Sequence, residues 1–162
     1  MAHQSREADR AQALAEQAFA LAASSADPSV LAQAHNLLGV LARRRGDLSA
    51  ADQHLQQSLN LAEGHRDPVA QVAALNNRAL VCEEGGEIDR ALALTQQALT
   101  LCAAYGDRHR EAALHNHLAD LLHAVNRSDE AMTHLKQAVT IFAEIGVEAG
   151  MRQPEIWKLA EW

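Results

Sequence analysis

The stretch from Asp67 to Gly106 reads DPVAQVAALNNRALVCEEGGEIDRALALTQQALTLCAAYG. It begins with an Asp-Pro pair, contains a Gly-Gly pair near its middle and ends on a glycine. Asp is favoured as a helix N-cap, and Pro is tolerated at the first helical position because no N–H is needed there. Gly accepts the left-handed conformation in which many helices end. The stretch therefore predicts two helices, with a break at Gly85 and Gly86 between them.

The same pattern occurs immediately before and after this stretch. Residues 27–66 read DPSVLAQAHNLLGVLARRRGDLSAADQHLQQSLNLAEGHR, and residues 107–146 read DRHREAALHNHLADLLHAVNRSDEAMTHLKQAVTIFAEIG. The first unit also begins with Asp-Pro, whereas Asp107 keeps the predicted cap without the proline. The corresponding breaks and helix ends are predicted at Gly46, Gly64, Asn126 and Gly146. Three consecutive units with a period of 40 residues are the signature of a repeat architecture.

Apolar residues in the second helix of each unit recur at helical spacing and not with the alternation of a strand. The successive columns are Ala51, Ala91 and Ala131, then Leu55, Thr95 and Leu135, then Ser58, Ala98 and Ala138. Small residues let two helices approach closely, and larger ones fill the space between neighbouring pairs. Because one helical pair cannot bury its own apolar face, the units must stack.

The units resemble the tetratricopeptide repeat. Gly39, Gly46, Ala51, Leu55 and Ser58 stand at the spacings of its signature, and residues 67–106 repeat most of them. The period is similar to that of the long-helix variety found in bacterial signal-transduction ATPases and regulators and in kinesin light chains. The resemblance implies an all-α, right-handed solenoid of antiparallel helix pairs, with about eight helices here.

The two ends are each predicted to hold part of a repeat. Residues 1–26 are in phase with the second helices and predict a lone N-terminal helix, while residues 147–162 are in phase with a first helix that begins at Pro154. These segments place apolar side chains at helical spacing, and they are candidates for self-association: Leu14, Leu21, Ile156, Trp157, Leu159 and Trp162. The alternative is that the C-terminal tryptophans fold back as a cap on the last pair.

The charge and composition exclude several classes of function. A formal net charge of −7 disfavours binding to nucleic acid or to anionic lipid. The only dense basic run, Arg43 to Arg45, is expected to complement a helix dipole and Asp47. There is no apolar run of membrane length, and two cysteines suggest a reducing compartment. The expectation is a cytoplasmic protein whose partner is a protein or peptide.

No catalytic or metal-binding signature is present. The sequence has no Gly-rich phosphate loop, no GxSxG and no HExxH, which argues against an enzyme and against a cofactor. Nine histidines occur, but none of those in residues 109–123 stand three or four apart as helical ligand pairs do. His35 and His115 share one repeat position, as do His54 and His134, and all four are interpreted as packing or surface residues. Cys82 and Cys102 are predicted core residues, too far apart for a disulfide.

Asparagines at one position of the first helices are the main functional signal. Asn36, Asn76 and Asn116 share this position, and Asn77 follows directly. The resemblance implies that first helices line the concave face, where an amide can donate to and accept from an extended peptide. Neighbouring positions complete the candidate peptide-binding set: Gln33, Val40, Arg43, Leu80, Glu83, Glu84, Asp120 and His123. The predicted groove is positive at one end and acidic beyond it.

Other interpretations of these residues stay open at the sequence level. The asparagines could instead bond within the helix layer and fix the pitch between repeats. Arg78 stands where Leu38 and Leu118 occupy the core, so it is either a buried charge with a partner or a side chain turned toward the groove. Three classes of function remain: a peptide-binding scaffold, a self-association module of a larger regulator, and a hidden hydrolase with a deep polar pocket.

Overall fold

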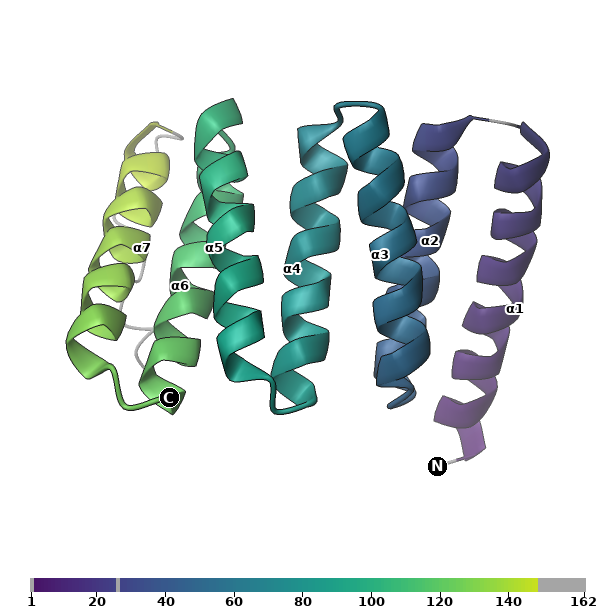
Figure 1. The fold of residues 1–162 in the computed structure, drawn as a ribbon, viewed down its shortest axis with the longest axis horizontal. Coiled ribbons are helices and arrows are strands. Elements are labelled where there is room, and N and C mark those ends of the chain that lie inside the picture. The colour runs from purple at the N-terminus through teal and green to yellow at the C-terminus, as the bar shows by residue number, and fades with distance from the viewer. Residues whose placement is uncertain (1, 26, 149–162) are drawn as a thin grey trace. The chain divides into compact units, whose positions relative to one another are not determined.

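The computed structural model describes residues 2–25 and 27–148, and these residues form α-helices and short connections without a β-strand. The helices are α1 (Ala2–Ser25), α2 (Pro28–Arg44), α3 (Leu48–Gly64), α4 (Pro68–Glu84), α5 (Ile88–Tyr105), α6 (Arg108–Ala124) and α7 (Ser128–Glu148) (Figure 1). The all-α prediction is confirmed. The expected helix from Pro154 lies outside the described residues.

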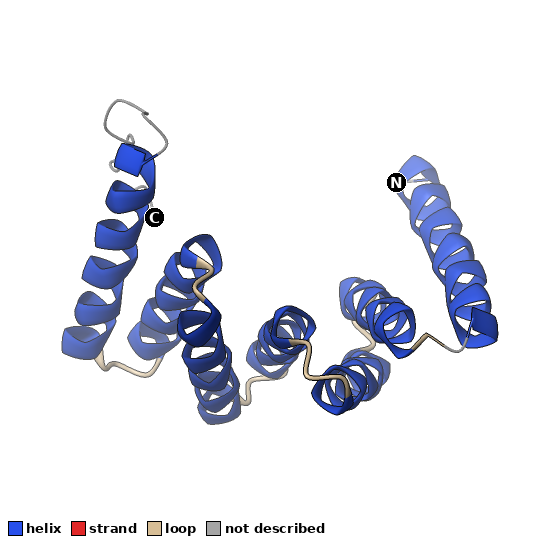
Figure 2. Cartoon of the chain, turned by 90° about the horizontal axis from the view of Figure 1, so that it is seen from above, coloured by secondary structure: helices blue, strands red, loops and turns tan. Residues whose placement is uncertain are grey.

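The chain divides into two compact units, which are described separately. Unit 1 comprises Met1–Glu87 and contains α1 to α4, and unit 2 comprises Ile88–Trp162 and contains α5 to α7. Within each unit, consecutive helices pack against one another and are joined by short loops (Figure 2). The boundary between the units falls between α4 and α5, inside the predicted repeat of residues 67–106. None of the described helices combines the length and apolar content needed to cross a membrane.

The predicted helix caps are confirmed at the side-chain level. The carboxylate of Asp27 accepts a hydrogen bond from the backbone N–H of Ser29 at 2.9 Å, and that of Asp67 accepts one from Ala70 at 3.0 Å. Asp107 caps α6 in the same way, without a proline. Such a cap satisfies a backbone donor that the first turn of a helix leaves unpaired.

The helix breaks recur every twenty residues, each at a residue with a positive φ. These residues are Gly46, Arg66, Gly86, Gly106 and Asn126. The breaks at Gly46, Gly86 and Asn126 are confirmed. The end predicted at Gly64 differs, because α3 includes that glycine and the left-handed residue is Arg66, with φ 55°. Gly146 likewise lies within α7, which continues to Glu148.

The core consists of the predicted columns of small and branched residues. Ala51, Leu55, Ala91, Thr95 and Ala98 are all fully buried, with no exposed side-chain surface. Gly39 shows how close α2 and α3 come, because a Cβ atom added there would stand 2.5 Å from Cγ of Leu55. Cys82 and Cys102 are both buried core residues, as predicted. Packing of this kind positions the first helices, which carry the candidate site.

Candidate peptide-binding face

In unit 1, the predicted binding residues gather on neighbouring first helices, α2 and α4. We call this surface the α2–α4 face; its members are Gln33, Asn36, Val40, Arg43, Asn76, Asn77, Leu80, Glu83 and Glu84. Gln33 and Glu84 are exposed and the others are half-buried. Helices α2 and α4 are in direct contact, so these residues form one surface and not two separate patches.

The asparagines at the centre of the α2–α4 face are hydrogen-bonded to each other. Nδ2 of Asn77 donates to Oδ1 of Asn36 at 2.9 Å. The bond therefore joins Asn36 to Asn77, whereas the sequence alignment of the repeats pairs Asn36 with Asn76. It uses one N–H of Asn77 and one lone pair of Asn36, so each amide keeps further donor and acceptor capacity.

The charged end of the α2–α4 face is an ion pair. Nη1 of Arg43 donates to Oε1 of Glu84, again between α2 and α4. The positive and acidic ends expected along the groove therefore neutralise each other locally, because the offset that joins Asn36 to Asn77 also joins Arg43 to Glu84. Val40 and Leu80 are half-buried and supply apolar surface on the same two helices.

The remaining predicted binding residues lie on α6, in unit 2. Asn116 is half-buried, and Asp120 and His123 are exposed. Nδ2 of Asn116 donates to Oδ2 of Asp120, one turn further along the same helix, at 3.4 Å. At this position the asparagine is thus bonded within its own helix, unlike Asn36 and Asn77.

Arg78 is a buried charge with a partner. Its side chain is 10% exposed, and its Nε donates to Oδ1 of Asp52 on α3 at 2.8 Å. Asp52 is 33% exposed and so keeps contact with water. The structure thereby decides between the two interpretations of Arg78, which faces α3 and does not enter the α2–α4 face.

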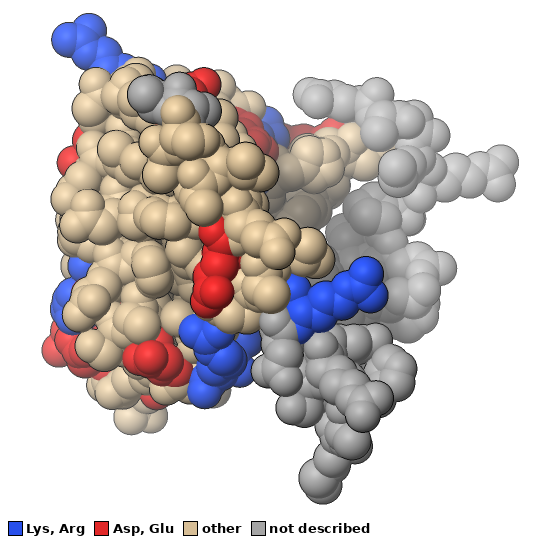
Figure 3. All heavy atoms as spheres, turned by 90° about the vertical axis from the view of Figure 1, so that its right-hand side faces the viewer, with Lys and Arg blue, Asp and Glu red and all other residues tan. Residues whose placement is uncertain are grey.

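The candidate self-association residues on α1 are exposed. Leu14 is 56% exposed and Leu21 is 71% exposed, while the residues that follow them, Ala15 and Ala22, are buried. Figure 3, which views the molecule from the α1 side, shows uncharged residues over much of this surface. The other candidates, Ile156, Trp157, Leu159 and Trp162, lie outside the described residues.

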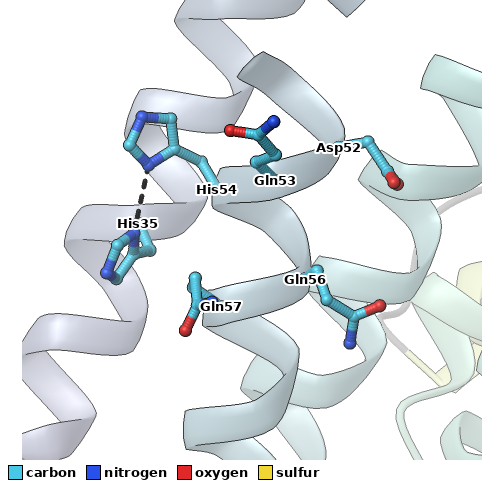
Figure 4. Close-up of a pocket in the computed structure, with 6 residues that line it drawn as sticks. All are labelled: His35, Asp52, Gln53, His54, Gln56 and Gln57. Atoms are coloured by element: carbon cyan, nitrogen blue, oxygen red, sulfur yellow. Dashed lines mark hydrogen bonds between the residues drawn. The ribbon is translucent and has the colours of Figure 1, made fainter. Parts of the chain in front are cut away.

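Two pairs of histidines face each other across helices, which the sequence analysis missed. Nδ1 of His35 on α2 lies 3.1 Å from Nδ1 of His54 on α3 (Figure 4). Nδ1 of His115 on α6 lies 2.8 Å from Nδ1 of His134 on α7. Ligand spacing of three or four residues within one helix does not reveal pairs that span two helices. The available signal was that both histidines of the first pair recur 80 residues later.

Comparison with known proteins identifies the repeat. Residues 71–144, a little under half of the chain, match the model of the tetratricopeptide repeat family. Residues 71–144 are thus a tetratricopeptide-like repeat segment, and the chain shares the fold of tetratricopeptide-like repeat proteins. No curated protein sequence matches this repeat protein.

Solved structures share the fold at low sequence identity. BtubC (BKLC) from P. vanneervenii aligns with a TM-score of 0.74 and 23% identity, over 85% of this chain and 57% of that one. Aspartyl phosphate phosphatase F from Bacillus subtilis aligns with a TM-score of 0.80 and 16% identity, over 91% and 38%. A putative kinesin light chain from Podosopora anserina, described as having nearly identical TPR-like repeats, aligns with 0.72 and 20%, over 87% and 70%. The repeat protein thus spans between about two fifths and seven tenths of these chains.

Proposed function

We propose that this repeat protein is a binding module, without catalytic chemistry, that holds an extended peptide or partner segment on the α2–α4 face in the cytoplasm. The observation that supports the proposal is the Asn36–Asn77 hydrogen bond. It orients two amides side by side and leaves the NH₂ group of Asn36 and the carbonyl oxygen of Asn77 able to bond a peptide group. Backbone recognition of this kind does not depend on the side chains of the peptide.

The surroundings of the amide pair suit a peptide of mixed character. Val40 and Leu80 can contact an apolar side chain of the peptide. Both are already half-buried, so this contact would bury only the part of each side chain that is still exposed. Arg43 keeps further N–H donors and Glu84 keeps further lone pairs, so each of these paired charges can make another polar contact. Asn76 supplies a further amide on α4.

The proposal is tested with peptides selected from a random display library against the immobilised full chain. Affinities of the best peptide are measured by fluorescence anisotropy for the wild type and for Asn76→Ala. We expect the variant to bind about 1–3 kcal/mol more weakly, because peptide groups lose their partner. The matched control is Gln57→Ala, which removes an exposed amide from a second helix and should leave the affinity unchanged.

A thermal melt separates recognition from a packing role of the asparagines. Binding by Asn76 predicts a lower affinity with an unchanged melting temperature. An unchanged affinity of the Asn76→Ala variant, or a library that yields no binder, would contradict the proposal. Asn36→Ala with Asn77→Ala should also lower the melting temperature, because that pair joins α2 to α4.

A second candidate function is self-association through α1. It is favoured by the exposure of Leu14 and Leu21, which stand seven residues apart on one side of the helix. Light scattering over a range of concentrations tests it, with Leu14→Gln and Leu21→Gln as one variant and removal of residues 151–162 as another. Association that either variant abolishes would support the candidate, and a monomer at every concentration before any change would refute it.

A further inference from the structure

The paired histidines lie outside the α2–α4 face and have no part in the proposed function. Each pair joins the first helix of a repeat to its second helix: His35 with His54, and His115 with His134. The ring centroids are 5.4 Å apart in the first pair and 5.1 Å apart in the second. Both pairs therefore share one geometry, in which the two Nδ1 atoms face each other.

The repeat itself shows that packing does not require these histidines. In the middle unit the same two positions are Leu75 and Leu94, and both leucines are buried. Leucine therefore satisfies the packing of this fold at both places. Where histidine occurs, it occurs at both positions together, in two of the three units. Such coupled recurrence indicates that the two rings act together.

We propose that each histidine pair chelates one late first-row divalent ion, such as Ni²⁺, Zn²⁺ or Cu²⁺, through its two Nδ1 atoms. Imidazole nitrogen is a preferred ligand of these ions. With metal–nitrogen bonds of about 2.0–2.1 Å, two donors in adjacent coordination positions stand about 2.9–3.3 Å apart. The separation of 3.1 Å in the first pair lies within this range, and that of 2.8 Å in the second pair lies just below it. A rotation of each ring about its Cβ–Cγ bond turns both lone pairs toward one ion.

Space for the ion and its other ligands exists beside the first pair. A pocket of about 470 Å³ is lined by His35 and His54 together with Asp52, Gln53, Gln56 and Gln57 (Figure 4). Asp52 is bonded to Arg78, so it remains with that partner. Water and the glutamine amides are therefore the groups that complete the coordination of an ion at this pair.

The second pair has carboxylates nearby that are already in use. Glu111 and Glu130 each precede a histidine of the pair by one helical turn, and each is bonded to an arginine, Arg108 and Arg127 respectively. Within the described part of the chain, no three or more His, Cys, Asp or Glu side chains are grouped as metal ligands. An ion at the second pair would thus have the two histidines as its protein ligands and would exchange readily, unlike a structural zinc ion with four.

A metal ion that binds a pair has to displace the hydrogen bond between its two Nδ1 atoms, because both of these nitrogens must direct a lone pair at the ion. The ring that carries its proton on Nδ1 then carries it on Nε2 instead.

The test is a calorimetric titration of the tag-free, metal-free chain with NiCl₂ and, separately, with ZnCl₂ at pH 7.5. We expect about two ions per chain for the wild type. Two variants copy the middle repeat, His35→Leu with His54→Leu and His115→Leu with His134→Leu; each should bind one ion, and the fourfold variant should bind none. His65→Gln with His109→Gln removes exposed histidines and is the matched control, with two ions expected.

A second measurement keeps the test independent of how the variants fold. Ni²⁺ is paramagnetic, so at low occupancy it should broaden the ring NMR signals of the four paired histidines of the wild type before those of His65 and His109. Circular-dichroism melts establish that each leucine variant is folded. A stoichiometry that the leucine variants do not change, broadening confined to exposed histidines, or no binding at millimolar ion would overturn the proposal and leave the pairs as hydrogen bonds between helices.

Discussion

Gly39 illustrates how single residues set the spacing of helices in this fold. A Cβ atom at this position would meet Cγ of Leu55 at 2.5 Å and the backbone oxygen of Ala51 at 3.2 Å. Leu55 is fully buried, so its side chain is already packed against other atoms. In the third repeat Ala119 stands at the position of Gly39 and packs in one cluster with Leu135, so the closest approach is particular to the first repeat.

Gly39→Ala is predicted to destabilise the protein although alanine is the better helix former. Overpacking costs about 1–3 kcal/mol, which exceeds the gain of about 1 kcal/mol in helix propensity. Urea unfolding measures the difference. In a Leu55→Thr background, which copies the second unit, the loss should shrink. Gly64→Ala is the control: a Cβ there meets nothing within 4 Å, so it should be neutral or stabilising, and a similar loss at both glycines would contradict the packing argument.

The histidine pairs predict a loss of stability in mild acid. The folded-state pKa values of His35, His115 and His134 are lowered mainly by burial, so the unfolded chain binds more protons. Their contribution is fully present above the unfolded value of about 6.5 and is lost as the pH falls through the lower folded values. Glu111 and Glu130 act in the opposite direction on the second pair by raising the pKa of His115 and His134.

Melting temperatures between pH 7.5 and pH 5 test this dependence on the histidine pairs. The wild type should lose more stability over that interval than the fourfold His→Leu variant, because leucine does not titrate. His109→Gln, a change at an exposed position, should follow the wild type. Parallel pH profiles for the wild type and the fourfold variant would show that these rings do not set the acid response.

At the scale of elements, α4 is held to its neighbours by polar contacts as well as by its core. It donates to Asn36 through Asn77, accepts from Arg43 through Glu84 and donates to Asp52 through Arg78. Its partners belong to α2 and to α3, so polar groups fix α4 against both. Removing the partner of a charged side chain such as Arg78 therefore costs stability mainly because that charge is left unpaired, and it disturbs the apolar packing less.

Asp52→Ala is predicted to lower the free energy of unfolding by about 1–3 kcal/mol, because it leaves the guanidinium of Arg78 unpaired while that side chain is 10% exposed. The lower end of this range applies because Asp52 itself is partly hydrated. Arg78→Leu introduces the residue found at Leu38 and Leu118, which are core residues, and should cost less. Combining both changes should restore much of the loss caused by Asp52→Ala. Urea denaturation of the four proteins measures the coupling. Additive losses would mean that the ion pair contributes no interaction energy.

At the scale of the whole molecule, the features that the sequence predicted are those with local signals. Asp27, Asp67 and Asp107 cap helices because an N-cap depends on one side chain and the next three residues. Arg66 was not predicted as the left-handed residue, because nothing in an arginine indicates that conformation and a glycine stood two positions earlier.

Features that depend on how two helices face each other could not be predicted from the sequence. Asn36 bonds to Asn77 and not to Asn76, since the rotation of α2 against α4 decides which side chain comes opposite. The partner of Arg78 was unknown for the same reason. The histidine pairs could have been found by asking which positions of a helical pair change together between units, where His35 and His54 both become leucine.

The twenty-residue spacing of the left-handed residues governs which changes in length this architecture can accept. Each forty-residue repeat supplies one first helix and one second helix, so duplication or loss of a whole repeat leaves every later helix with the kind of neighbour that its sequence fits. Gain or loss of a single helix would put a second helix where a first helix is expected, and every helix after it would meet a neighbour of the wrong kind. Viable natural or engineered length variants of this protein should therefore differ by even numbers of helices.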